Sequence, residues 1–117
     1  LEQVIANLVS NSLTHGFAGM ETGRIHLQVQ AVDPTRVILR YADNGTGIPA
    51  AILNRIFEPF FTTRLGQGGS GLGLYIVYNL VTGVLGGVIQ AHSQPGQGTA
   101  FTLVLPRAAP DSGGLTH

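Results

Sequence analysis

The stretch Asp43-Asn44-Gly45-Thr46-Gly47-Ile48-Pro49 directly follows an apolar segment and is the most informative part of this 117-residue chain. A carboxylate at this point can accept a hydrogen bond from an exocyclic amine, and spaced glycines let the backbone turn and approach a flat ring closely. The stretch therefore suggests a nucleotide site. Because Asp-Asn-Gly is also a common turn, the residues alone leave a plain hairpin loop as an even alternative.

The composition limits the chemistry that the chain can perform. A hydrophobic content of 44% and a mean hydropathy of +0.26 suit one compact domain and leave no room for a second. The absence of cysteine excludes disulfides, thiolate metal sites and cysteine nucleophiles. Six acidic residues balance six basic ones, all arginine, so we expect no nucleic-acid partner. Without lysine, a phosphate would be bound by arginine, backbone amides or a metal.

No segment approaches the roughly 20 apolar residues of a membrane span, and the start lacks the pattern of a signal peptide. We therefore expect a cytoplasmic domain with no direct membrane contact, which leaves open whether a full-length protein is membrane-anchored. The first helical residues have no capping residue ahead of them, so we expect a piece cut from a longer protein. Residues 107–117 are expected to form a C-terminal tail.

Hydrophobic periodicity predicts a helix and a strand pair, followed by a second helix and strand pair. The predicted helices span 1–16, 50–56 and 70–85, and the predicted strands span 25–31, 37–41, 88–92 and 99–105. A glycine- and threonine-rich stretch, 57–69, is expected to be a mobile loop. This order predicts an α+β fold in which the helices form one layer on one face of a sheet.

Two more constellations could contribute to a nucleotide site. Asn7 and Asn11 are four residues apart on the predicted first helix, so both side chains lie on one face. An amide oxygen can ligate Mg²⁺, although such a pair on a helix is more often solvated or capping. Glycines crowd residues 66–73, where the N–H groups that open the next helix could bind a polyphosphate. This segment is neither a P-loop nor a dinucleotide fingerprint, and a flexible turn is its alternative reading.

Together these segments resemble the ATP-binding catalytic domain of sensor histidine kinases, in the superfamily shared with gyrase, Hsp90 and MutL. The resemblance covers nearly the whole chain and implies a Bergerat fold, a two-layer α/β sandwich with a mixed, largely antiparallel sheet, over residues 1–106. The strand and helix that usually precede the first motif are not found. In chain order, the N, G1, F and G2 boxes and the final G-x-G-T correspond to residues 8–12, 43–47, 57–61, 69–74 and 96–99.

The resemblance implies a site for ATP and Mg²⁺, with two catalytic asparagines. Asn11 would ligate the metal, Asn7 would support the metal and the phosphates, and Asp43 would accept a hydrogen bond from the adenine amine. Residues 57–68 would form a lid over the nucleotide. The other residues implied to bind ATP are His15, Gly45, Gly47, Ile48, Phe60, Arg64, Gly69, Gly71, Leu72, Gly73 and Thr99.

The chain departs from the family pattern at Thr14, where many members have a lysine. His15 or Arg64 could supply the missing phosphate contact. On the residues alone, a histidine at a helix end more ordinarily interacts with the terminal carbonyls. For Arg64, a solvated loop position is as good an interpretation as a phosphate contact.

The implied reaction is transfer of the ATP γ-phosphoryl group to a histidine on a helical dimerisation domain, with a response regulator receiver domain as the indirect partner. No histidine here is followed by an acidic residue in the acceptor setting, so we expect the acceptor upstream and an incomplete activity for the chain alone. Hydrolases of the superfamily carry a glutamate base at the position of Asn7, and Glu2 falls on the opposite helix face. The alternatives are an anti-sigma-type serine kinase, suggested by residues 11–17, and a degenerate regulatory module.

Overall fold

The computed structural model describes residues 1–17, 19–20, 22–59 and 73–106. Its elements confirm the predicted order of helices and strands. They are α1 (Glu2–Asn11), η1 (Ser12–Gly16), β1 (Ile25–Asp33), β2 (Arg36–Asp43), α2 (Ala50–Leu53), α3 (Gly73–Asn79), η2 (Leu80–Val84), β3 (Val88–Ser93) and β4 (Thr99–Pro106). The helix predicted over 50–56 is shorter than expected and ends at Leu53. Most of the expected mobile loop, from residue 60 onward, lies outside the described residues.

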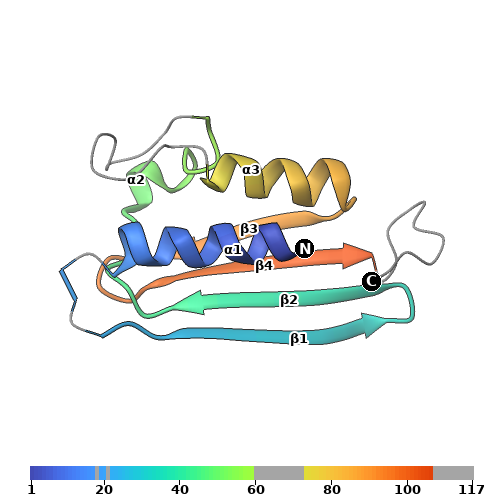
Figure 1. Cartoon of the computed structure of the whole chain (residues 1–117), viewed down its shortest axis with the longest axis horizontal. Coiled ribbons are helices and arrows are strands. Elements are labelled where there is room, and N and C mark those ends of the chain that lie inside the picture. Colours follow the sequence, from blue (N-terminus) through green and yellow to red (C-terminus); the bar gives the residue numbers. More distant parts are fainter. Residues whose placement is uncertain (18, 21, 60–72, 107–117) are drawn as a thin grey trace.

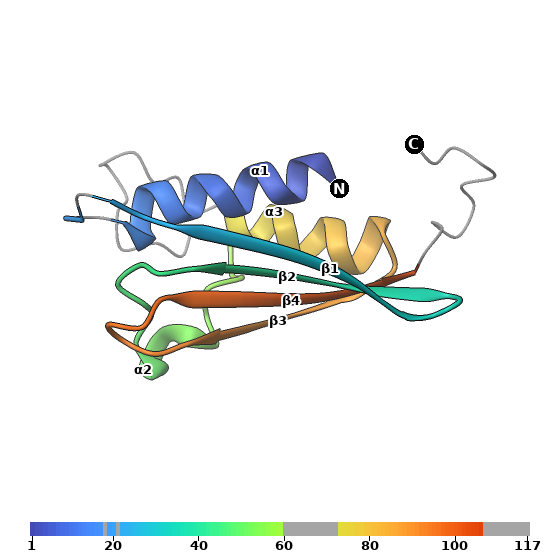
Figure 2. The ribbon, with the colours of Figure 1, turned by 90° about the horizontal axis from the view of Figure 1, so that it is seen from below.

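The described strands form one sheet in the order β1-β2-β4-β3, with antiparallel pairing throughout. The helices α1 and α3 lie side by side over one face of this sheet, as the two perpendicular views show (Figures 1 and 2). The short helix α2 contacts β3. This arrangement confirms the predicted α+β fold with two layers.

Strand alternation determines which side chains enter the core. In β4 every second residue is buried, which is the pattern expected when one sheet face is covered by helices. Val4 and Leu8 of α1 and Val77 of α3 are fully buried against this face. The sheet contributes Leu39, Tyr41, Ile89, Phe101, Leu103 and Leu105.

Both long helices end in a π-helical turn, which periodicity did not predict. The N–H of Phe17 donates to the carbonyl of Ser12 over 2.8 Å, and the N–H of Leu85 donates to the carbonyl of Leu80 over 2.8 Å. Each bond spans five residues instead of four, so the last turn is wider than an α-helical turn. At the end of α1 this wider turn carries Ser12 and His15, two residues next to the predicted site.

The hairpin between β1 and β2 is closed by an Asx-type turn at Asp33. One carboxylate oxygen accepts hydrogen bonds from Thr35 Oγ1 and Thr35 N, both over 2.8 Å, and the other accepts from the Arg36 guanidinium at 3.0 Å. These bonds, first that from the Thr35 hydroxyl, lower the pKa of Asp33 to about 2. The turn therefore fixes the register of the hairpin that ends at Asp43.

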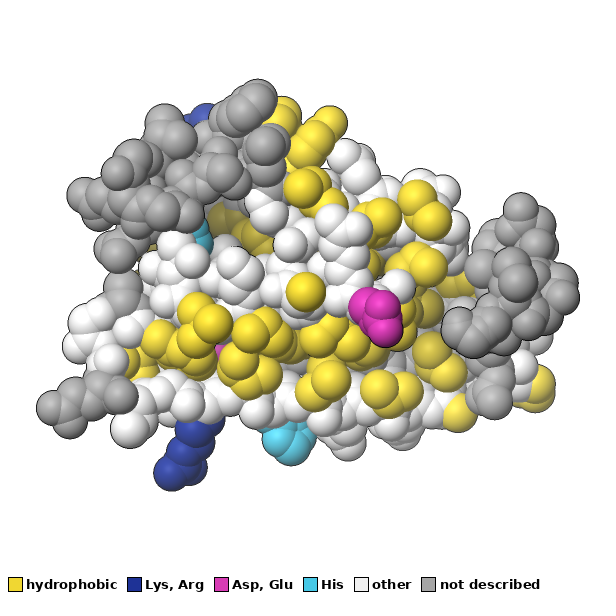
Figure 3. All heavy atoms as spheres, in the orientation of Figure 1, with side chains coloured by type: hydrophobic (Ala, Val, Ile, Leu, Met, Phe, Trp, Pro, Cys, Tyr) yellow, Lys and Arg dark blue, Asp and Glu magenta, His cyan; other side chains and the backbone are white. Residues whose placement is uncertain are grey.

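The edge strand β1 leaves apolar side chains uncovered. Register places Leu27 opposite Tyr41 and Val29 opposite Leu39, so these side chains share the helix-covered face. Leu27 is nevertheless 45% exposed and Val29 61% exposed. Figure 3 shows the resulting band of apolar side chains on this face of the molecule.

None of the helices in the described ranges combines the length and the hydropathy that a membrane-spanning helix needs.

Candidate functional site

Asp43 is the last residue of β2 and is 7% exposed. Its Oδ1 atom accepts hydrogen bonds from the backbone N–H groups of Gly45, at 3.0 Å, and Thr99, at 3.1 Å. Its Oδ2 atom accepts a hydrogen bond of 2.7 Å from Ser12 Oγ. Donors from the first helix, the loop after β2 and the start of β4 therefore fix the orientation of this carboxylate.

The loop 44–48 is bonded on both sides to other parts of the backbone. The N–H of Thr46 donates to the Gly16 carbonyl over 2.7 Å, and the Thr46 carbonyl accepts from the N–H of Gly96 over 2.7 Å. The N–H of Ile48 donates to Ser93 Oγ over 2.7 Å. This loop thus connects the end of the first helix to the β3–β4 turn.

Two glycines are required by close contacts between these backbones. Gly47 has a φ of +83°, and a Cβ atom on it would lie 2.1 Å from the carbonyl oxygen of Gln94. Gly98 has a φ of +84°, and its Cβ atom would lie 2.0 Å from the carbonyl oxygen of Asp43. The predicted use of Gly47 beside a flat ring stays a prediction, whereas its packing against Gln94 is a second role that the sequence did not indicate.

Thr99 is buried and belongs to the same hydrogen-bond network as Asp43. Its Oγ1 lies 3.0 Å from Ser93 Oγ, which donates to the Gly98 carbonyl over 2.8 Å. Because a hydroxyl group has one hydrogen and Ser93 uses it on Gly98, Thr99 is the donor in its bond to Ser93. The Thr99 hydroxyl therefore retains acceptor capacity.

A hollow of about 420 Å³ lies at this end of the sheet. Its lining includes Asp43 and Thr99, together with Leu53 from α2 and Ser93 from β3, which the sequence analysis did not select. The remaining lining residues are Ala42, Ala91, His92, Gln94, Gln97, Gly98 and Ala100.

Comparison with known proteins identifies the family. The chain matches the model described as "Histidine kinase-, DNA gyrase B-, and HSP90-like ATPase" over residues 1–109. The chain belongs to this family. It is 43% identical over 106 residues to the alginate biosynthesis sensor protein KinB of Pseudomonas aeruginosa, an alignment that covers 91% of this chain and 17% of KinB. The chain spans less than a fifth of the length of the curated relatives it matches.

Solved structures place the chain within the histidine kinase branch of the ATPase family. The catalytic domain of histidine kinase ThkA is 31% identical, with a TM-score of 0.73, and the match covers 91% of this chain and 66% of that one. Full-length ShkA in complex with AMPPNP is 34% identical, with a TM-score of 0.73 over 89% of this chain and 20% of that one. Likeness at this identity extends to the fold and to the family of the domain.

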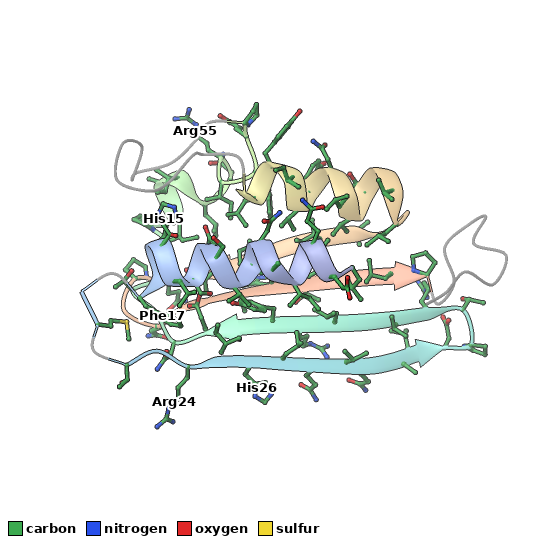
Figure 4. The ribbon with its side chains drawn as sticks, in the orientation of Figure 1. His15, Phe17, Arg24, His26 and Arg55 are labelled. Carbon is green, nitrogen blue, oxygen red and sulfur yellow. The ribbon has the colours of Figure 1, made fainter. Side chains whose placement is uncertain are left out.

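In this histidine-kinase-type domain, the first helix carries the predicted phosphate and metal residues Asn7 and Asn11. Asn7 and Asn11 are partly buried on α1, and the residue after Asn11 is the serine that bonds Asp43. The Nδ2 atom of Asn7 is buried and has no hydrogen-bond partner among the described residues. His15 extends from the end of the first helix on the side away from β1 (Figure 4).

The F box and the G2 box of the domain are described only at their borders. Phe57 is anchored by ring contacts, with centroids 5.5 Å from Tyr78 and 6.3 Å from Phe101, and Gly73 is the first residue of α3. The remaining predicted site residues lie outside the described residues, so their roles stay predictions. They are Phe60, Arg64, Gly69, Gly71 and Leu72.

Sequence reasoning missed Ser12 and Tyr41 as parts of the site. Both side chains are buried, and their hydroxyl oxygens lie 2.7 Å apart. The signal for Tyr41 was available, because a residue two positions before Asp43 on a strand shares its face. Ser12 directly follows the predicted metal ligand, but nothing in the helical period alone indicates that it contacts β2 and not the solvent.

Proposed function

We propose that this domain binds Mg²⁺-ATP and transfers the γ-phosphoryl group to a histidine on a helical dimerisation domain of the same protein. A response regulator receiver domain would be the next acceptor of the phosphoryl group. Membership of the histidine kinase branch supports this proposal, as does the AMPPNP complex of the related ShkA.

The single observation that carries the proposal is the buried, oriented carboxylate of Asp43. A buried carboxylate is retained in a protein when hydrogen bonds compensate its desolvation. Here two backbone amides and one hydroxyl do so, which leaves acceptor capacity for one more donor beside the hollow. An exocyclic amine of adenine is such a donor, and Gly45, Gly47, Ile48 and Thr99 would surround the base.

The chemistry of α1 suits the phosphates and the metal. An unpartnered amide N–H of Asn7 matches a phosphate oxygen, since it can only donate, whereas the side-chain oxygen of Asn11 is a suitable ligand for Mg²⁺. The bound metal would neutralise phosphate charge during transfer. The described residues hold no group of three or more His, Cys, Asp or Glu that could bind a metal, so the phosphates would supply further ligands. His15, Arg64, Phe60 and the glycines of residues 69–73 would complete the site.

Transfer is favoured over hydrolysis because α1 lacks a general base at the required position. The superfamily's hydrolases carry a glutamate where this chain has Asn7, and an amide cannot accept a proton from water. Glu2, the acidic residue of α1, is exposed in its first turn. A histidine acceptor needs no strong base, because its imidazole is itself the nucleophile; positioning and charge neutralisation then supply most of the catalysis.

Calorimetric titration of Mg²⁺-ATP into the chain and two variants tests the binding part of the proposal. We expect Asp43→Asn to bind at least about hundredfold more weakly. The two backbone amides would hold the remaining oxygen at the Oδ1 position, so an NH2 donor would replace Oδ2 and face the amine of the base. Asn11→Ala should weaken binding with Mg²⁺ and have little effect with EDTA. Glu2→Gln and Asn79→Ala, at exposed polar positions away from the hollow, are the matched controls. Unchanged affinity in both site variants would contradict the assignment.

The transfer part is tested by adding a helical dimerisation domain of the same protein and radiolabelled ATP. Acid-labile, base-stable label on that domain is the expected product, because phosphohistidine has this stability. Binding of ATP without label transfer would identify a degenerate nucleotide-binding module. Acid-stable label would instead indicate a serine kinase.

A further inference from the structure

Beneath Asp43 lies a buried pair of hydroxyl groups that base recognition by the carboxylate alone does not explain. Tyr41 is 1% exposed and Ser12 is 0% exposed. Tyr41 precedes Asp43 by two residues on β2, so both side chains point to the same sheet face. Ser12 reaches them from the first turn of η1.

Counting the hydroxyl hydrogens assigns the donor and the acceptor in each of these contacts. Ser12 Oγ donates to Asp43 Oδ2 over 2.7 Å, and a hydroxyl group has a single hydrogen. The Tyr41 hydroxyl must therefore donate in the 2.7 Å contact with Ser12 Oγ, and it shares its hydrogen with the Leu8 carbonyl at 3.1 Å. Tyr41 thus orients Ser12, and Ser12 orients Asp43.

The same count applies to the carboxylate. A carboxylate offers about four acceptor positions on its two oxygens. Two amide N–H groups occupy Oδ1, and Ser12 occupies one position on Oδ2. One acceptor position remains, and it belongs to Oδ2. A Cβ atom on Gly16 would lie 3.0 Å from this oxygen, so the helix end also packs closely beside it.

We propose that Ser12 and Tyr41 are positioning residues that hold Asp43 with one free acceptor position and thereby set the preference for a 6-amino base over a 6-oxo base. The inference rests on the proposed function. A fixed Oδ2 lone pair attracts the amine of adenine and repels the carbonyl oxygen of hypoxanthine. A carboxylate free to turn could instead accept a hydrogen bond from the N1–H group of hypoxanthine. Chains that lack either hydroxyl group should therefore fold but discriminate less between the two bases.

The test compares the binding of Mg²⁺-ATP and Mg²⁺-ITP to the chain by calorimetry. We express discrimination as the dissociation constant for Mg²⁺-ITP divided by that for Mg²⁺-ATP. For Ser12→Ala we expect this ratio to fall by about tenfold, the effect of losing one hydrogen bond to a charged group. For Tyr41→Phe we expect a smaller fall in the same direction. Because the two groups act in series, the double variant should match Ser12→Ala alone. Ser10→Ala, on the exposed side of α1, and Tyr78→Phe, at an exposed ring, are the matched controls.

The outcomes separate this inference from the function on which it rests. Wild-type preference for ATP together with unchanged ratios in folded Ser12→Ala and Tyr41→Phe chains would overturn the positioning role and leave the function standing. Additive effects in the double variant would overturn the serial arrangement. If Ser12→Ala fails to fold, Tyr41→Phe decides, because it keeps the buried ring and removes one oxygen. Absence of binding by the wild-type chain would overturn both proposals.

Discussion

At the scale of single residues, Tyr41 combines a position in the apolar core with a hydrogen-bonded hydroxyl group. Its ring lies within the apolar core, with its centroid 6.4 Å from that of Phe101, and its hydroxyl is hydrogen-bonded. Burial, and to a smaller extent the charge of Asp43, raise the pKa of Tyr41, although the bond with Ser12 acts in the opposite direction. The folded chain therefore retains this proton more strongly than the unfolded chain does.

This shift predicts a loss of stability at high pH. The contribution of neutral Tyr41 is fully present below its usual pKa of 10.0 and is lost as pH rises through the raised value, because the unfolded chain then binds fewer protons. Above pH 10 we therefore expect the free energy of unfolding to fall more steeply for the wild-type chain than for Tyr41→Phe. Urea denaturation of the wild-type chain and of Tyr41→Phe at pH 9 and 11 measures these free energies of unfolding. Equal losses in both chains would contradict the prediction, and Tyr78→Phe is the control.

Single residues also differ in how far the sequence predicted them. Asp43 and Gly47 could be selected because a carboxylate and spaced glycines follow an apolar strand, whereas Thr99 was implied by the family resemblance. The structure brings Asp43 and Thr99 into one hydrogen-bond network. Ser12 and Tyr41 were missed because their role depends on a contact between α1 and β2. Hydrophobic periodicity assigns a residue to a face but does not tell which neighbour it meets.

At the scale of the elements, the site is held by two loops that contact each other through glycines. The loop 44–48 and the turn 94–98 approach so closely that Gly47 and Gly98 tolerate no side chain. Gly96 belongs to the same turn and has a similar φ of +82°, but a Cβ atom on it would meet nothing within 4 Å. Substitution of Gly96 would therefore introduce backbone strain alone, whereas substitution of Gly98 would introduce the same strain together with a steric clash.

We expect Gly98→Ala to be much more destabilising than Gly96→Ala. Both substitutions place an L-residue in the left-handed region, which costs about 1–2 kcal/mol. Gly98→Ala adds a Cβ atom 2.0 Å from the carbonyl oxygen of Asp43, and the resulting backbone shift should bring the total to at least about 3 kcal/mol. Free energies of unfolding from urea denaturation provide the measurement. Similar losses in the two variants would show that the turn can relax.

The elements themselves were well predicted, except that α2 ends earlier than expected and both long helices end in π turns. Periodicity located both long helices and all four strands because each has a continuous apolar face. Periodicity did not predict the π turns, because each is a single turn. One wider turn shifts the spacing of apolar residues too little to be recognised in the sequence. The first helix ends at Gly16, as predicted, and its terminal carbonyl accepts a hydrogen bond from Thr46 N over 2.7 Å.

At the scale of the whole molecule, the sheet is asymmetric. β3 contacts α2 and η2, whereas β1 pairs only with β2 among the described strands and exposes Leu27 and Val29. An exposed edge strand with an apolar face and no lysine or proline is a site of self-association in solution. Composition could not predict this, because the apolar residues of β1 have the same alternation as those of a covered strand.

We therefore expect the isolated chain to self-associate as its concentration rises, and Val29→Lys to suppress this association. A lysine on the apolar face of an edge strand opposes strand addition by charge. Gln28→Lys adds the same charge on the opposite face and is the control. Sedimentation velocity at several concentrations gives the measurement. A monomeric wild-type chain at every concentration, or equal effects of the two lysines, would contradict the expectation.

The bonds from Gly45 N and Thr99 N to one carboxylate oxygen have a further consequence. Most amides in a sheet are protected from deuterium exchange by other backbone groups, but these two depend on a side chain. Removing that side chain would expose both amides together while β4 keeps its pairing with β2 and β3. The exchange rates of two amides far apart in the chain should therefore rise and fall together, and they report how firmly Asp43 is held.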